Sequence, residues 1–156
     1  MNLNRLEKLA TFLHNYDGPI RCNLSVWNDG YHKRCGFLWL RKKFVNEEAC
    51  AIGLTCIEGA LREEGLVACS RALAGGFIIP QYQSARMWHA VKAFFGLNSA
   101  QAEACFMPRS YGHKPSFKDV AARIRKTIAE HRQRQRQHTI DKLLDPVDWP
   151  FVSENA

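Results

Sequence analysis

The sequence predicts a mainly α-helical fold, a single compact domain of four to five helices with at most a small β element near residues 20–44. Two observations lead to this prediction. The 156 residues are 46% hydrophobic and 24% charged, which is the balance of one packed globular domain and excludes a disordered chain or a coiled coil. Apolar residues also recur every three or four positions in several segments, which are bounded by residues that start or stop helices.

The N-terminal part is expected to form one helix followed by the β element. Apolar residues at helical spacing predict an amphipathic helix over 3–15. Alternation of apolar and polar residues over 20–26 and an apolar run over 37–40 indicate two strands or extended segments. The apolar residues of the helix are Leu3, Leu6, Leu9, Ala10 and Leu13.

A second helix is expected over 47–64 and is taken as the centre of the core. Asn46 is a favourable N-cap, and Gly65 suits the position just after a helix. Gly53 lies inside this segment, on a stripe of small residues. Because glycine costs about 1 kcal/mol relative to alanine inside a helix, its presence there indicates that another backbone packs closely against it.

Two shorter helices are expected next. Residues 85–95 carry an apolar stripe that Gly96 ends. Asn98 and Gln101 form the pattern of a capping box, which predicts a helix up to about residue 106.

A long basic helix follows, with Ser116 and Asp119 as its cap. Its first half has an apolar face, but residues 129–139 contain no large apolar side chain. We therefore expect the outer half of this helix to project from the domain.

The net charge of +7 is distributed unevenly along the chain. The basic helix, residues 118–138, holds seven basic and two acidic residues, whereas residues 139–156 hold one basic and four acidic residues. We therefore expect a single helical domain over 1–140, followed by an acidic, extended tail over 141–156.

The basic helix is the strongest functional signal in the sequence. Arg125, Arg132 and Arg136 share one helix face. Arg123 and Arg134 lie on another face, where they are expected to form i,i+4 pairs with Asp119 and Glu130. Arginine side chains suit phosphate oxygens, so the pattern favours nucleic-acid binding, although a solvated and salt-bridged helix end has the same pattern.

The loop before this helix extends the predicted interface. Its cations lead into a helix N-terminus, which favours anions, and Tyr111 has a ring that can stack on a base. The predicted nucleic-acid-binding residues are Arg109, Tyr111, Lys114, Arg123, Arg125, Lys126, Arg132, Arg134 and Arg136.

The acidic tail suggests an alternative function. Trp149 and Phe151 lie among apolar residues in an acidic setting, and they either cover the protein's own core or dock on a second protein. In the second case the protein is an inhibitor or adaptor, for example an anti-defence protein that acts on a host protein.

Enzyme and metal signatures are weak, so a non-enzymatic protein without cofactor or metal is expected. His32 and Cys35 have no partner pair at zinc-ligand spacing, and a small zinc module or enzyme remains the second alternative. The six cysteines are expected to be reduced core thiols. Arg5, Glu7 and Lys8 are incompatible with a signal peptide, and no apolar run is long enough to span a membrane, so a cytoplasmic location is expected.

Several short motifs together resemble a family of short uncharacterised proteins of bacteria and their phages. The resemblance implies no activity and no site residues, but it favours an accessory protein of a phage or other mobile element. The motifs are Asn23-Leu24-x-x-Trp27, Cys35-Gly36, Ala49-Cys50-Ala51-Ile52-Gly53, Trp88, Phe94-Phe95-Gly96-Leu97, Ala102, Phe106 and Val120-Ala121-x-Arg123-Ile124.

These observations lead to one expected function. The protein is a non-enzymatic accessory protein that binds nucleic acid or a nucleoprotein through its basic C-terminal helix. The sequence leaves open whether the partner is DNA or RNA, and it leaves the oligomeric state open.

Overall fold

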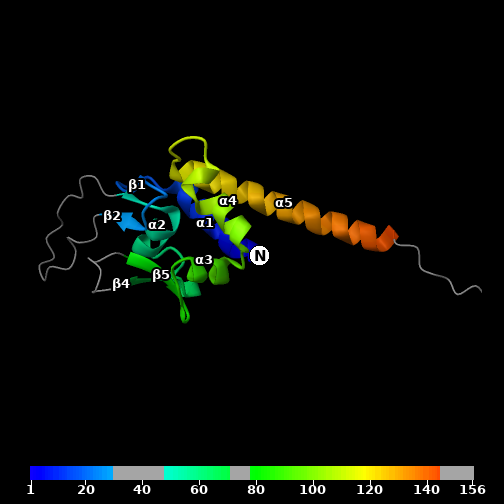
Figure 1. Cartoon of the computed structure of the whole chain (residues 1–156), viewed down its shortest axis with the longest axis horizontal. Coiled ribbons are helices and arrows are strands. Elements are labelled where there is room, and N and C mark those ends of the chain that lie inside the picture. Colours follow the sequence, from blue (N-terminus) through cyan, green and yellow to red (C-terminus); the bar gives the residue numbers. More distant parts are fainter. Residues whose placement is uncertain (30–47, 71–77, 145–156) are drawn as a thin grey trace, which may run out of the picture.

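The computed structural model describes residues 1–29, 48–70 and 78–144 (Figure 1). The predicted mainly α-helical fold is confirmed, because the described residues form five α-helices and only short strands. The helices are α1 (Leu3–Asn15), α2 (Ala51–Glu58), α3 (Met87–Phe95), α4 (Ser99–Phe106) and α5 (Phe117–Leu144). The strands are β1 (Arg21–Cys22), β2 (Asn28–Asp29), β3 (Glu48–Ala49), β4 (Val67–Ser70), β5 (Ile78–Tyr82) and β6 (Ala85–Arg86).

Helix α1 has the predicted bounds and lies along the first half of α5. The Asn2 side chain accepts a hydrogen bond from the Arg5 backbone N–H and so caps the helix. The ring of Tyr16 meets that of Phe117 at a centroid distance of 5.4 Å, near the end of α1 and the start of α5. The two helices therefore run in opposite directions. Of the predicted apolar face of α1, Leu6, Leu9, Ala10 and Leu13 are buried and Leu3 is partly buried.

Helix α2 is the buried centre of the core, but it is shorter than the predicted helix over 47–64. It begins after Cys50, whose sulfur accepts the Gly53 N–H, because Glu48 and Ala49 are paired as a strand. It ends before Gly59, which adopts a left-handed conformation with φ of 71°.

The predicted close approach at Gly53 is confirmed. An ideal Cβ built on Gly53 would lie 1.5 Å from the carbonyl oxygen of Trp27. The segment that leads into β2 therefore crosses α2 with no room for a side chain.

Two small sheets flank these helices. In the first, β3 lies between β1, to which it is parallel, and β2, to which it is antiparallel. The second sheet is antiparallel in the order β4-β5-β6 and lies outside the region where a β element was expected. Because Ala85 and Arg86 pair with β5, helix α3 starts at Met87 rather than at the predicted residue 85. The apolar run predicted over 37–40 lies outside the described residues.

The caps of the last two helices follow the predicted pattern. Asn98 and Gln101 form both hydrogen bonds of a capping box at α4. At α5, the Asp119 carboxylate accepts from the Ser116 backbone and hydroxyl, and the Ser116 hydroxyl accepts the Asp119 N–H. Helix α5 continues to Leu144, so the tail predicted to be extended from residue 141 is helical for its first four residues.

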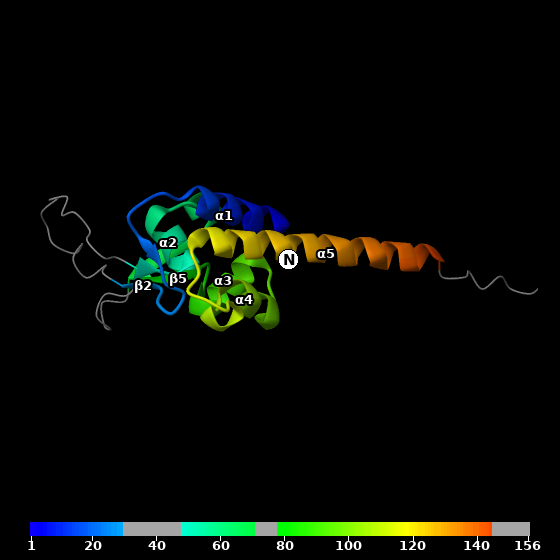
Figure 2. The ribbon, with the colours of Figure 1, turned by 90° about the horizontal axis from the view of Figure 1, so that it is seen from above.

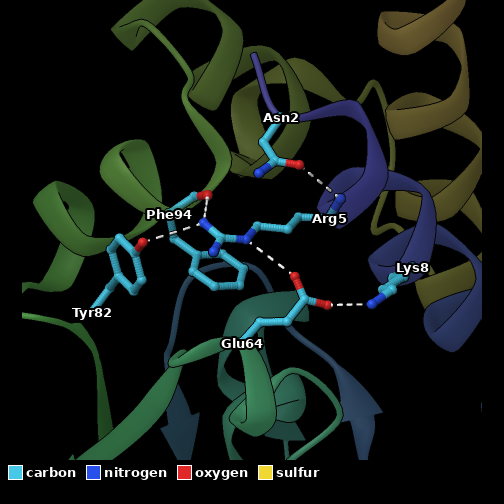
Figure 3. Close-up of polar contacts among 6 residues, drawn as sticks. All are labelled: Asn2, Arg5, Lys8, Glu64, Tyr82 and Phe94. Atoms are coloured by element: carbon cyan, nitrogen blue, oxygen red, sulfur yellow. Dashed lines mark hydrogen bonds and ion pairs between the residues drawn. The ribbon is translucent and has the colours of Figure 1, made fainter.

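Arg5 joins α1 to the rest of the core (Figure 3). Its guanidinium donates to Glu64 at 3.1 Å, to the carbonyl oxygen of Phe94 at 2.8 Å and to the Tyr82 hydroxyl at 3.4 Å. It also lies 4.2 Å from the centroid of the Phe94 ring. This half-buried cation therefore fixes the position of α1, on which α5 rests.

Candidate nucleic-acid interface

The outer half of α5, residues 129–144, projects beyond the body of the protein, as predicted (Figures 1 and 2). Ile128 is the last buried residue of the helix. Within the described chain, the last hydrogen bond from α5 to another element joins Arg132 to Glu7 of α1, at 2.8 Å. At a rise of about 1.5 Å per residue, the helix extends about 18 Å past Arg132.

One face of α5 carries cations without acidic residues, and we call it the basic stripe. At 100° per residue, its members fall within an arc of about 40°, and all of them are exposed. The three acidic residues of the helix lie more than about 100° away from the centre of this arc. The basic stripe consists of Lys118, Arg125, Arg132 and Arg136.

Lys118 is a member of the basic stripe that the sequence analysis did not include among the site residues. Its position was readable, because Lys118, Arg125 and Arg132 follow one another at intervals of seven residues, close to two helical turns. Lys118 also lines an open hollow of about 390 Å³ together with Arg21 and Lys114, so the stripe begins among further cations.

Arg123, predicted to bind nucleic acid, points into the body instead. It donates to the carbonyl oxygen of Ser110 at 2.8 Å, and its guanidinium carbon lies 5.0 Å from the centroid of the Tyr111 ring. The expected pair with Asp119 is not formed, because that carboxylate caps α5 through Ser116, whose hydrogen bonds lower the pKa of Asp119.

The remaining two predicted cations of α5 lie on its mixed face, away from the basic stripe. Lys126 approaches Glu130 at 4.0 Å. Arg134 was expected to pair with the Glu130 carboxylate, but its Nε donates to the Glu130 backbone carbonyl at 3.4 Å. Acidic and basic groups alternate on this face, so its attraction for a phosphate backbone is weaker than that of the stripe.

The predicted role of Tyr111 as a stacking platform is wrong. Its side chain is 8% exposed, and its hydroxyl donates to the carbonyl oxygen of Cys105 at 2.7 Å. Burial raises the pKa of this hydroxyl. Tyr111 therefore anchors the loop to α4, and its ring is not available to a base.

The two cations of the same loop are exposed but paired. Arg109 forms an ion pair with Glu103, and Lys114 lies 3.3 Å from a carboxylate oxygen of Glu48. The hydrogen bonds from Asn23 and Lys114 lower the pKa of Glu48. A phosphate must compete with these carboxylates, so the loop is a weaker anion site than the basic stripe.

The residues of two other predicted features, the protein-binding tail and the zinc site, lie outside the part of the chain that the structure describes. Trp149 and Phe151 lie outside the described residues, as do His32 and Cys35. In the described part of the chain, no group of three His, Cys, Asp or Glu side chains has a metal-binding arrangement.

Of the five cysteines that the structure describes, four are buried and unpaired, as expected of core thiols, whereas Cys69 is only half-buried. Burial raises the pKa of Cys50 to about 11 and those of Cys22 and Cys56 to about 12, which disfavours the nucleophilic thiolate. The fourth is Cys105, whose pKa burial also raises.

No described helix is both long and apolar enough to cross a membrane. Comparisons of the chain with family models, curated proteins and solved structures find no match.

Proposed function

We propose that this protein binds nucleic acid through the phosphate backbone, without catalysis, using the basic stripe of α5. The observation that supports this function is the separation of charge on an exposed helix: the cations of the stripe gather on one face and the acids on another. Guanidinium groups form charge-assisted hydrogen bonds to phosphate oxygens, and these contacts position a protein on nucleic acid. The resemblance to short uncharacterised proteins of bacteria and their phages supports an accessory role in a mobile element.

The stripe determines the strength and the salt dependence of this binding. Four phosphate contacts give a slope of about −3.6 in log affinity against log salt, so affinity falls about 150-fold between 50 and 200 mM salt. The Arg132 contact is partly offset by Glu7, which competes with the phosphate for the same guanidinium.

A pair of triple variants with equal charge tests the proposal. The stripe variant is Arg125→Gln, Arg132→Gln and Arg136→Gln, and the control is Lys126→Gln, Arg134→Gln and Lys142→Gln. Affinity is measured by fluorescence anisotropy on random-sequence DNA and RNA at about 50 and 200 mM salt. The stripe variant is expected to lose affinity and salt dependence, and the control to retain most of both. Equal losses in the two variants would mean that net charge, not the stripe, determines binding.

A second function is supported by the apolar end of α5. Ile140, Leu143 and Leu144 are 48%, 80% and 73% exposed, which is unusual for large aliphatic side chains. These residues would dock on a second protein in the inhibitor or adaptor alternative. That alternative requires a stable protein complex that is lost in Leu143→Asp and Leu144→Asp variants and is unaffected in the stripe variant.

A further inference from the structure

We infer that the nucleic acid is duplex DNA and that the outer half of α5 lies in its major groove. This inference rests on the proposed function and adds the form of the partner. After Arg132, the twelve residues from Gln133 to Leu144 are exposed on all sides of the helix. An α-helix with its side chains is about 10–12 Å wide, which matches the major groove of about 12 Å.

The outer half also carries side chains suited to reading base edges. Gln133 and Gln137 are one turn apart on the face directed away from the body, and Ile140 lies close to the same line. Arg136 flanks the two glutamines on one side and Arg134 on the other, each about 60–100° around the helix. A helix seated on this face therefore points amides at the bases and the Arg136 guanidinium at the phosphates on one side. On the other side Asp141 lies between Gln137 and Arg134, so that side carries charges of both signs.

Glutamine in the major groove recognises adenine by a bidentate contact to N6 and N7. The apolar Ile140 side chain suits the methyl group of thymine. The Gln137 amide donates to Asp141 at 2.7 Å, and this exposed hydrogen bond must break before Gln137 can contact a base. Gln133 is exposed and, within the described chain, does not have to give up such a bond. The predicted preference is therefore for A·T pairs, with Gln133 as the main determinant.

The other forms of nucleic acid fit the described residues less well. Single strands are held by stacking on exposed aromatic rings, but the exposed large hydrophobic residues in the described part of the chain are Met87, Ile140, Leu143 and Leu144. In duplex RNA the major groove is too deep and narrow for side chains to read.

The form of the partner is tested by anisotropy titrations of the full chain at about 50 mM salt. The probes are an A·T duplex of about 20 base pairs, one of its single strands, the RNA duplex of the same sequence, and a G·C duplex. The A·T duplex is expected to bind at least about fivefold more tightly than each of the others. A single strand or an RNA duplex that binds as tightly would overturn the inference.

The groove contact is tested with 7-deazaadenine, which lacks only the N7 acceptor. Replacing adenine by 7-deazaadenine in the A·T duplex is expected to weaken wild-type binding about fivefold or more. A Gln133→Ala, Gln137→Ala variant is expected to bind the two duplexes with equal affinity. Gln135→Ala, on the opposite face of the helix, is the matched control and should behave as the wild type.

The two proposals fail in different ways. Equal binding of every probe with a steep salt dependence would refute the duplex inference and leave phosphate binding by the stripe intact. No binding to any probe at low salt would refute both.

Discussion

Replacing Gly53 by alanine should destabilise the protein, although the same change stabilises most helices by about 1 kcal/mol. The reason is the Trp27 carbonyl oxygen, which would lie 1.5 Å from the new methyl carbon. The carbonyl oxygen is a main-chain atom, and the main chain also fixes the position of a Cβ, so no rotamer change can relieve the contact. Either α2 or the segment before β2 must shift.

The magnitude follows from what that shift disrupts. Overpacking of a core by one methyl group costs about 1–3 kcal/mol, and the overlap here is against backbone, which favours the upper end. The shift would also weaken the hydrogen bond from the Cys50 N–H to the Val26 carbonyl oxygen, which is 2.9 Å long in the wild type, at a cost of about 1 kcal/mol. After the gain in helix propensity, the net loss is about 2–3 kcal/mol.

Thermal unfolding by circular dichroism measures this loss. At about 3 °C per kcal/mol, the Tm of Gly53→Ala should fall by about 6–9 °C. Gly112→Ala is the matched control, because a Cβ at Gly112 has nothing within 4 Å and the residue is not in a left-handed conformation. The control should change stability by less than about 1 kcal/mol. A Gly53→Ala protein that melts at or above the wild-type temperature would refute the packing of this segment on α2.

The polar anchors of the fold give two further predictions. Arg5→Met should lower the free energy of unfolding by about 2 kcal/mol at pH 7, measured by urea denaturation, because the contacts to Glu64 and Phe94 are lost. The hydrogen bonds from Lys8 and Arg5 hold the pKa of Glu64 below its usual 4.5, so this stabilisation is complete above that pH and disappears as the pH falls through the lowered pKa. The difference between Arg5→Met and the wild type should therefore be smaller near pH 3, and an equal difference at both pH values would contradict the Glu64 contact. Tyr111→Phe should cost about 1 kcal/mol in the same assay, through loss of the bond to Cys105, and should leave nucleic-acid affinity unchanged. A clear loss of affinity would restore Tyr111 to the interface.

The elements that the sequence predicts well are those with local signals. The leucine spacing of α1, the capping box of Asn98 and Gln101, and the cap of Ser116 and Asp119 each depend on residues within one or two turns.

The start of α2 was mispredicted because a distant contact overrides a local signal. Glu47 and Glu48 are typical of a helix N-terminus, but Ala49 pairs with both Cys22 and Asn28 as the middle strand of a sheet. The sheet of β4, β5 and β6 was missed because strand pairing here also overrides a local signal. Pro80 lies inside β5, and proline argues against a strand when only the sequence is considered.

In the candidate site, too, the features set by local sequence could be predicted and those set by distant contacts could not. The basic stripe is a property of one helix, so its periodicity can be read from the sequence. The partners of the other cations are far away in the chain: Arg132 meets Glu7, and Lys114 meets Glu48. The burial of Tyr111 likewise depends on how its loop packs on α4, which no local pattern encodes.

The salt dependence of nucleic-acid binding by the stripe variant decides whether the basic stripe is the phosphate-binding face of the protein. Between 50 and 200 mM salt, wild-type affinity should fall about 150-fold, whereas the variant with only Lys118 left in the stripe should lose about 3.5-fold. The control with three charges removed elsewhere on α5 should keep most of the wild-type dependence. A stripe variant that retains the full wild-type slope would contradict the assignment of phosphate binding to this face of α5.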